Sequence, residues 1–322
     1  MLILYMSEKD IEATLINRAE ELGTIFTDTS TRTRTRARKS THTRTRTHEE
    51  DRLLNLLEET DDSLKSILLN SEHSDLTKAK GLQLLRQYED DPENNSTSLS
   101  AIQLILKLPT KIKNAPISLK NTHEEILSFL HDAWKHMESQ VYGHKHAKSE
   151  IIEYLVARLL SGHVQPRVLG LVGPPGVGKT TLAMHGIGHA MKAPFYHLSI
   201  GGLRDVNYFS GSLRCWKGAH QGMFTDILIK EQCLNPIIYI DELDKIATET
   251  STDIYGILTH ATDPLTNKYI QDHFLGIDID LSKVTFIFSY NDPTCLPVPL
   301  RDRIKEIVLP GFNDEEKTEK MI

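Results

Sequence analysis

The sequence has little of what marks a secreted or membrane protein. Its 322 residues include only three cysteines, Cys215, Cys233 and Cys295. So few thiols, odd in number and widely spaced, argue against a disulfide framework or a zinc site. No apolar run approaches the roughly 20 residues that a membrane-spanning helix needs, and the apolar start at residues 1–6 is too short for the core of a signal peptide. These absences favour a reducing compartment inside the cell, either the cytoplasm or an organellar matrix, and no membrane partner.

Charge is distributed unevenly along the chain. Residues 29–48 alternate Thr with Arg or His and contain seven basic side chains and no acidic one. Because the net charge is −7, the rest of the chain carries −14, which argues against a general nucleic-acid-binding surface. The segment cannot bury enough surface to fold. It is either a solvated linker or a basic arm, residues 32–46, that docks on nucleic acid or on an acidic partner.

Apolar spacing predicts how the chain is organised. Residues 1–50 are expected to be mostly disordered around one short helix candidate at 7–22, and residues 51–139 to be helical. In that second region Leu64, Ile67 and Leu68 share one face of a helix, and 101–106 and 126–137 are amphipathic. The stretches 90–98 and 109–116 have loop composition.

Residues 140–310 alternate short apolar runs with helical patterns. The expected strands are 168–172, 195–200, 237–240, 284–289 and 306–309, and the expected helices are 180–191, 220–232 and 252–261. Strands that alternate with helices of this length predict a parallel sheet covered by helices, and therefore an α/β fold.

A complete phosphate-binding loop follows the first of these strands. It reads Gly173-Pro174-Pro175-Gly176-Val177-Gly178-Lys179-Thr180 and continues with Thr181. Glycines let the backbone turn its N–H groups toward phosphate oxygens. Lys179 can reach the β- and γ-phosphates, and the Thr180 hydroxyl can bind Mg²⁺. Strand, loop and helix in this order predict a nucleotide site.

Two carboxylates end the strand at 237–240. Asp241 and Glu242 are expected at the edge of the sheet where the loop lies. Asp241 would hold Mg²⁺ together with Thr180, and Glu242 would act as a general base toward water. The alternative is an ordinary pair of solvated acids at a strand end.

Two further candidates follow the strand at 284–289. Asn291 is placed to hydrogen-bond a γ-phosphate or a water, although Asn is also a frequent turn residue. Arg303 could reach the phosphates of a neighbouring subunit. Arg301 competes for that role, and a surface salt bridge is the alternative for either arginine.

With these motifs in this order, the chain resembles an AAA+ ATPase module, and within that class it resembles the Lon ATP-dependent proteases. The likeness is carried by residues 142–144, 152–155, 171–179, 199–205, 280–284 and 309–312. It is strong over residues 130–322 and weaker over 75–130.

The resemblance implies a P-loop AAA+ fold that takes ATP and Mg²⁺ and assembles into a ring, expected to be a hexamer, acting on unfolded polypeptide. Asn291 would be the first sensor, Arg303 a finger acting in trans, and Tyr142 a residue against the adenine. Trp216 and Lys217 match the aromatic–aliphatic pair that grips substrate in the pore. Lys217 replaces the apolar partner, and a partly buried packing aromatic is the alternative for Trp216.

The resemblance also sets an expectation for the end of the chain. Residues 311–322 would begin a small helical lid, from Asp314 onward, and no residue matches the Ser–Lys dyad of the protease domain. We therefore expect ATP hydrolysis coupled to pulling on polypeptide, without peptide cleavage by this chain. The alternatives are a nucleotide-responsive interaction protein with little hydrolysis, and an AAA+ factor that acts on nucleic acid through residues 32–46.

If the basic arm binds phosphate backbones, its affinity should fall steeply with salt, because released counterions drive such contacts. Retention on DNA or RNA between about 50 and 200 mM salt tests this, with a chain that lacks residues 29–48 as the control. A flat salt response, or equal retention after the deletion, would contradict a nucleic-acid role.

Overall fold

The computed structural model describes residues 63–92, 94–113, 122–161, 168–247 and 250–312. The expectations for residues 7–22 and 29–48, for the start of the helical region at 51–62, and for a lid from Asp314 lie outside these ranges. All described residues fall within one compact unit of the chain. Among them, no helix is both long and apolar enough to cross a bilayer.

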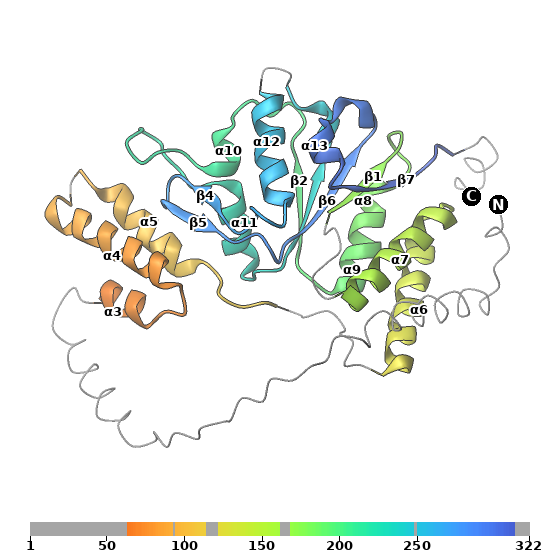
Figure 1. Ribbon diagram of the computed structural model, residues 1–322, viewed down its shortest axis with the longest axis horizontal. Helices are drawn as coiled ribbons and strands as arrows, with labels where there is room; N and C mark the ends of the chain where they lie inside the picture. The colour runs from red at the N-terminus through yellow and green to blue at the C-terminus, as the bar shows by residue number, and fades with distance from the viewer. Residues whose placement is uncertain (1–62, 93, 114–121, 162–167, 248–249, 313–322) are drawn as a thin grey trace, which may run out of the picture. The chain divides into compact units, whose positions relative to one another are not determined.

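A five-stranded parallel sheet forms the centre of this unit, in the order β2-β3-β6-β1-β7 (Figure 1). Its strands are β1 (Val168–Val172), β2 (Phe195–Ser199), β3 (Ile237–Asp241), β6 (Thr285–Tyr290) and β7 (Lys305–Val308). Val172 pairs with Tyr290, and Ile240 pairs with Phe288. The expected parallel sheet and α/β fold are confirmed.

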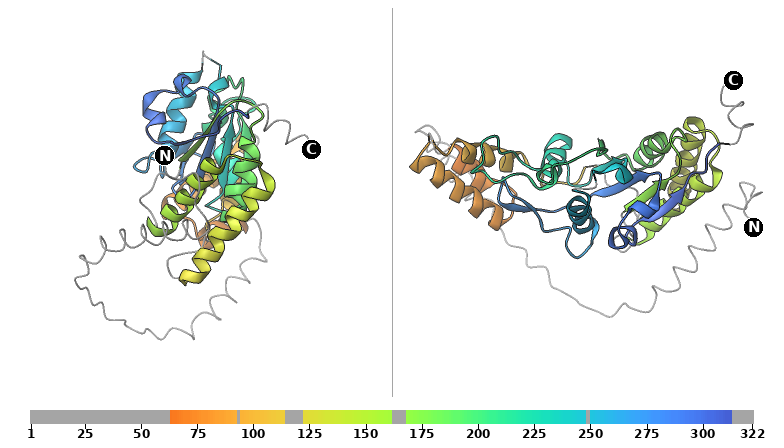
Figure 2. Two further views of the ribbon diagram at one scale, coloured as in Figure 1. Left: turned by 90° about the vertical axis from the view of Figure 1, so that its right-hand side faces the viewer. Right: turned by 90° about the horizontal axis from the view of Figure 1, so that it is seen from above.

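Helices cover both faces of the sheet, as the side views also show (Figure 2). One layer contains α6 (His123–Gln140), α7 (Lys145–Ser161) and the helix after the glycine loop, and the other contains α10 (Asn207–Ser210), α11 (Met223–Glu231), α12 (Ser251–Thr262) and α13 (Val298–Arg301). Val172, Ile238 and Phe288 belong to the hydrophobic cluster under the second layer. Because side chains alternate along a strand, Tyr239 and the residue paired with it, His197, face the first layer.

The helix after the glycine loop differs from the regular helix expected at 180–191. It is built from α8 (Lys179–Thr181), a π-helical segment η1 (Leu182–Gly188) and α9 (His189–Met191). Helix α6 packs along the π-helical segment. Spacing of apolar residues does not distinguish one wide π turn from an α-helix, so the sequence carried no signal for it.

The N-terminal helices pack beside the sheet rather than on it. These are α3 (Ser63–Asn70), α4 (Asp75–Asp90) and α5 (Ser96–Lys107), and α4 contacts a hairpin of β4 (Ile270–Asp272) and β5 (Ile277–Ile279) that the sequence did not predict. Leu68 is fully buried but Ile67 is 53% exposed, so the helix face that they share is only partly buried. The loop expected through residue 98 ends earlier, because α5 begins at Ser96. The division at residues 139 and 140 stays a prediction.

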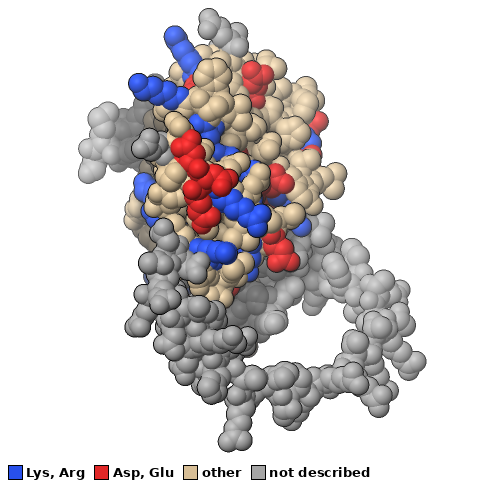
Figure 3. All heavy atoms as spheres, turned by 90° about the vertical axis from the view of Figure 1, so that its left-hand side faces the viewer, with Lys and Arg blue, Asp and Glu red and all other residues tan. Residues whose placement is uncertain are grey.

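The surface drawn in Figure 3 mixes the two signs of charge. Lys and Arg side chains lie among Asp and Glu side chains over the described residues of this face. A mixed surface of this kind gives no long-range field of one sign to attract a highly charged partner.

Asp272 ties the β4–β5 hairpin to α11. It is only 2% exposed. One carboxylate oxygen accepts hydrogen bonds from the backbone N–H groups of Phe274 (2.9 Å) and Leu275 (3.0 Å). The other accepts from the Gly222 N–H (2.9 Å) and the Thr225 hydroxyl (2.5 Å). A buried carboxylate is tolerated here because its two oxygens accept four hydrogen bonds.

We predict that Asp272→Asn destabilises the protein, because the amide NH₂ group cannot accept the bonds that one carboxylate oxygen now accepts. The free energy of unfolding, measured by urea denaturation, should fall by about 2 kcal/mol or more. Asp278→Asn, on the exposed position of the same hairpin, is the matched control and should have little effect. Equal stability of the two variants would contradict this account of the hairpin.

Candidate nucleotide site

The glycine loop leaves the sheet at the end of β1 and is held on both sides. The Gly173 N–H donates to the Tyr290 carbonyl at 3.2 Å, and the Leu309 N–H donates to the Val172 carbonyl at 2.7 Å. A Cβ on Gly173 would lie 2.1 Å from the Leu309 carbonyl oxygen, so no other residue fits there without moving backbone. Gly176 and Gly178 have φ values of +79° and +93°, which glycine adopts without strain.

Lys179 lies inside this loop and reaches the residue that follows β6. Its ammonium donates to the carbonyls of Gly173 (2.6 Å) and Pro174 (3.1 Å), and to Oδ1 of Asn291 (2.8 Å). Partial burial lowers the pKa of Lys179, and the carboxylates of Asp241 and Asp244 oppose that shift. The structure therefore brings Asn291 next to the loop lysine, which a turn residue alone would not require.

Thr180 and Asp241 form the oxygen pair expected at a cation site. Thr180 Oγ1 lies 3.4 Å from Asp241 Oδ2, and Ser289 donates a hydrogen bond to the other oxygen, Oδ1. Hydroxyl and carboxylate oxygens suit Mg²⁺, which is held by one or two protein groups and completes its shell with water and phosphate. Within the described ranges, no group of three or more His, Cys, Asp or Glu could hold a metal. Thr180 and Asp241 would thus supply only part of the ligand shell of a cation here.

Glu242 has a strained backbone and a defined side-chain contact. Its φ of +60° is left-handed, which is uncommon for a residue other than glycine. Its backbone N–H donates to Asp241 Oδ1 at 2.9 Å, and Ser199 donates to its Oε2 at 3.2 Å. A Cβ on Gly201 would lie only 2.3 Å from Glu242 Oε2. The exposed carboxylate is therefore directed by its neighbours rather than freely solvated.

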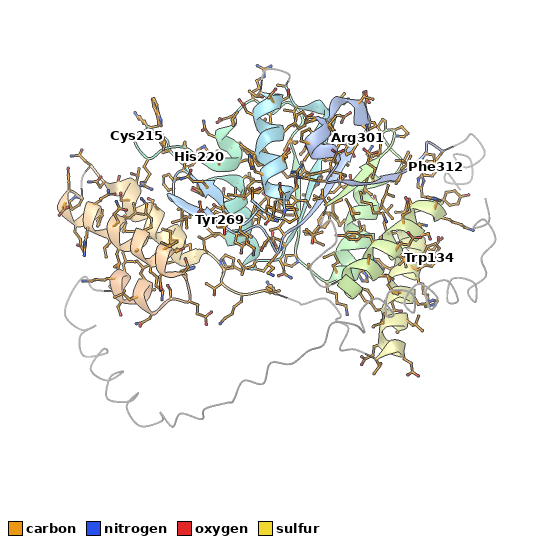
Figure 4. All side chains as sticks on the ribbon, in the orientation of Figure 1. Trp134, Cys215, His220, Tyr269, Arg301 and Phe312 are labelled. Atoms are coloured by element: carbon orange, nitrogen blue, oxygen red, sulfur yellow. The ribbon has the colours of Figure 1, made fainter. Side chains whose placement is uncertain are left out.

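Both candidate arginines are paired within the chain. Arg303 contacts Asp263 at 2.8 Å and also donates to the Pro299 carbonyl. The hydrogen bond from Arg303 to the Asp263 carboxylate lowers the pKa of Asp263. Arg301 (labelled in Figure 4) binds Glu306 through two hydrogen bonds of 2.8 and 3.3 Å. These are the intramolecular salt bridges weighed as the alternative, and a finger role for Arg303 stays a prediction.

Tyr142 lies in an aromatic group beside the loop. Its ring is 42% exposed and 6.4 Å from the Phe312 ring. His144 lies 4.8 Å from Phe312, and its Nε2 is 3.1 Å from the Val177 carbonyl oxygen of the glycine loop. Aromatic faces next to a phosphate loop suit a nucleobase, and the adenine contact of Tyr142 stays a prediction.

Trp216 and Lys217 lie elsewhere, on the segment between α10 and α11, whose neighbours Cys215 and His220 are labelled in Figure 4. Trp216 is 67% exposed, so the alternative of a packing aromatic is not what the structure has. Both residues line a cleft of about 490 Å³ together with Asp205. A substrate role for the pair stays a prediction.

Sequence reasoning missed three side chains of the site. Tyr239 places its hydroxyl 3.1 Å from Thr180 Oγ1, Ser289 binds Asp241, and Ser199 binds Glu242. One signal was available: Tyr239 lies two residues before Asp241, so the two share a face of β3. The partners from β2 and β6 depend on strand order, which the spacing along the chain does not give.

Comparison with known proteins agrees with this geometry. Residues 169–311 match the family described as ATPase family associated with various cellular activities (AAA). The chain is 34% identical over 269 residues to Lon protease 3 of Sorangium cellulosum, covering 84% of this chain and 31% of that protein. It is 35% identical over 236 residues to the peroxisomal Lon protease homolog 2 of Oryza sativa subsp. indica, covering 73% and 26%. A Lon protease homolog of Acanthamoeba polyphaga mimivirus is 36% identical over 232 residues, covering 70% and 23%. The chain thus spans about a quarter to a third of these relatives' lengths.

We predict that Gly201→Ala separates nucleotide binding from turnover. The new methyl group would displace the Glu242 carboxylate, 2.3 Å away, without touching the glycine loop. ATP turnover should fall roughly tenfold to a hundredfold, as small misplacements of a reacting group do, while nucleotide affinity stays unchanged. Gly256→Ala, in α12 with no atom within 4 Å of the added methyl group, controls for the substitution itself. Unchanged turnover in a folded Gly201→Ala protein would show that the carboxylate's position does not matter.

Proposed function

Since the chain contains an AAA+ ATPase module of the Lon type, we propose that residues 140–310 bind ATP with Mg²⁺ and hydrolyse it. The observation that carries this proposal is the convergence of three strand ends. Lys179 after β1 contacts Asn291 after β6 at 2.8 Å, and Thr180 contacts Asp241 of β3 at 3.4 Å. The glycine loop, the Thr180–Asp241 pair and the Asn291 amide thus lie together at one edge of the sheet.

The loop residues would hold the triphosphate. A bound phosphate offers the Lys179 ammonium anionic oxygens in place of the Gly173 and Pro174 carbonyls that it now contacts. Charge-assisted bonds to phosphate are stronger than bonds to neutral carbonyls, so the exchange favours binding. Thr180 and Asp241 would hold Mg²⁺, which supplies positive charge against the phosphate oxygens.

Glu242 would take the proton of the attacking water. The carboxylate is exposed, oriented by Ser199 and one residue beyond the proposed metal ligand. Asn291, held by Lys179, would present its amide to the γ-phosphate or the water. Water positioned between these two groups meets the requirement for general-base catalysis, a base within one hydrogen bond of the proton that it removes.

Ring assembly and work on polypeptide are further parts of the proposal, motivated by the Lon relatives. Arg303 would exchange Asp263 for the phosphates of an adjacent subunit, and Trp216 with Lys217 would contact substrate polypeptide. The exposure of Trp216 supports this, because an aromatic that is two-thirds solvated has unused contact area. Lys217 adds a positive charge beside that aromatic.

The relatives also bear on the cellular location and on peptidase activity. Relatives include a mitochondrial protein of Yarrowia lipolytica and peroxisomal proteins of plants, and a cytoplasmic or organellar location is proposed for this chain. The relatives are proteases by name; peptide-bond cleavage is not proposed for residues 63–312.

We predict that Glu242→Gln lowers ATP turnover by about a hundredfold or more, as expected when a general base is removed. The amide keeps the size of the side chain and its hydrogen bond with Ser199, so nucleotide affinity should be retained. Phosphate release measures the first quantity, and a fluorescent ATP analogue measures the second.

Lys179→Ala provides the contrast, because it removes the ammonium from the loop and should weaken nucleotide binding itself. Unchanged turnover in Glu242→Gln would remove the proposed base. Weak nucleotide binding with little turnover in the unmodified chain would instead favour the nucleotide-responsive interaction protein.

A further inference from the structure

A row of polar side chains lies beneath the proposed cation site, on the sheet face that meets the helix beginning at Lys179. His197 pairs with Tyr239 across β2 and β3, and Ser199 pairs with Asp241 one step further along. Ser289 of β6 extends the Ser199–Asp241 pair to a third strand by its hydrogen bond to Asp241. Strand interiors covered on both faces are normally apolar, so these polar groups need a reason.

Tyr239 is the least expected of them. The other residues of β3 before Asp241 are isoleucines, and the Tyr239 side chain is fully buried. Its hydroxyl lies 3.1 Å from Thr180 Oγ1. A buried phenol needs a hydrogen-bond partner, and the Thr180 hydroxyl supplies one.

The two oxygens of Asp241 have different partners. Oδ1 accepts from the Ser289 hydroxyl and from the Glu242 N–H at 2.9 Å. Oδ2 lies 3.4 Å from Thr180 Oγ1 and 3.7 Å from His197 Nε2. Oδ1 is thus held by hydrogen bonds from β6 and from the next residue, whereas Oδ2 is directed toward the Thr180 hydroxyl.

We propose that Tyr239, supported by Ser289, is a positioning residue that orients the Thr180 hydroxyl and the Asp241 carboxylate for a divalent cation. A threonine hydroxyl can rotate about its C–O bond, and only some rotations direct a lone pair at a cation. A hydrogen bond with a buried tyrosine restricts that rotation before the cation arrives. Such partners of ligating groups commonly control metal affinity. The inference rests on the proposed nucleotide function of this site.

The test compares two tyrosines on neighbouring strands. Tyr239→Phe removes only the hydroxyl that meets Thr180. Tyr290→Phe is the matched control, because Tyr290 is also buried but its hydroxyl donates to Glu306 at 3.1 Å and belongs to the opposite face of the sheet. Binding of a fluorescent ATP analogue is measured in EDTA and across a Mg²⁺ titration, so the readout does not require turnover.

For Tyr239→Phe we expect the Mg²⁺ concentration that gives half of the maximal gain in analogue binding to rise about five- to tenfold, because one hydrogen bond at a charged site is lost. Affinity in EDTA should stay within about twofold of the unmodified chain, because the glycine loop is intact. Ser289→Ala should shift the Mg²⁺ dependence in the same direction, and Tyr290→Phe should not shift it.

An unchanged Mg²⁺ dependence in Tyr239→Phe would overturn the proposal, and so would an equal shift in Tyr290→Phe. If Tyr239→Phe does not fold, Ser289→Ala decides the question by the same two measurements. If the unmodified chain binds the analogue equally well with Mg²⁺ and with EDTA, the metal-dependent part of the proposed function fails as well. That outcome is distinct from a failure confined to Tyr239.

Discussion

Parallel hydrogen bonding among β1, β6 and β3 is the interaction on which the site depends. It holds Val172 opposite Tyr290 and Ile240 opposite Phe288, so that the residues just beyond these ends meet at one edge. Lys179, Asp241 and Asn291 come from segments more than 40 residues apart and have no local reason to meet. Because side chains alternate along a strand, a slip of β3 by one residue would turn Asp241 away from Thr180.

Lys179 of the candidate site and Arg303 beyond it are already paired before any ligand binds. Lys179 donates to two carbonyls and to Asn291, and Arg303 is held by Asp263. Breaking such contacts without replacement would leave a desolvated charge, which is costly. The proposed binding and assembly would therefore exchange these partners for phosphate. The free energy of each exchange would depend on how much more strongly phosphate binds the cation than its present partner does.

The two buried tyrosines of the sheet show how partners, rather than residue type, assign a role. Tyr239 contacts Thr180 on the face with the glycine-loop helix, whereas Tyr290 contacts Glu306, which also binds Arg301. Burial raises the pKa of both hydroxyls, that of Tyr239 to about 12. Both therefore act as neutral hydrogen-bonding groups, one within the candidate cation site and one within the scaffold that carries α13.

Local spacing in the sequence determined the glycine loop, the strand ending at Asp241, the alternation of strands with helices and hence the parallel α/β fold, because these features depend on residues close in the chain. Only the tertiary structure decided which groups meet: the Lys179–Asn291 bond, the Thr180–Tyr239 contact, the salt bridges of Arg301 and Arg303, and the outward position of Ile67. Those depend on strand order and on which helix face finds a partner. Neither is encoded by the period of apolar residues within one segment.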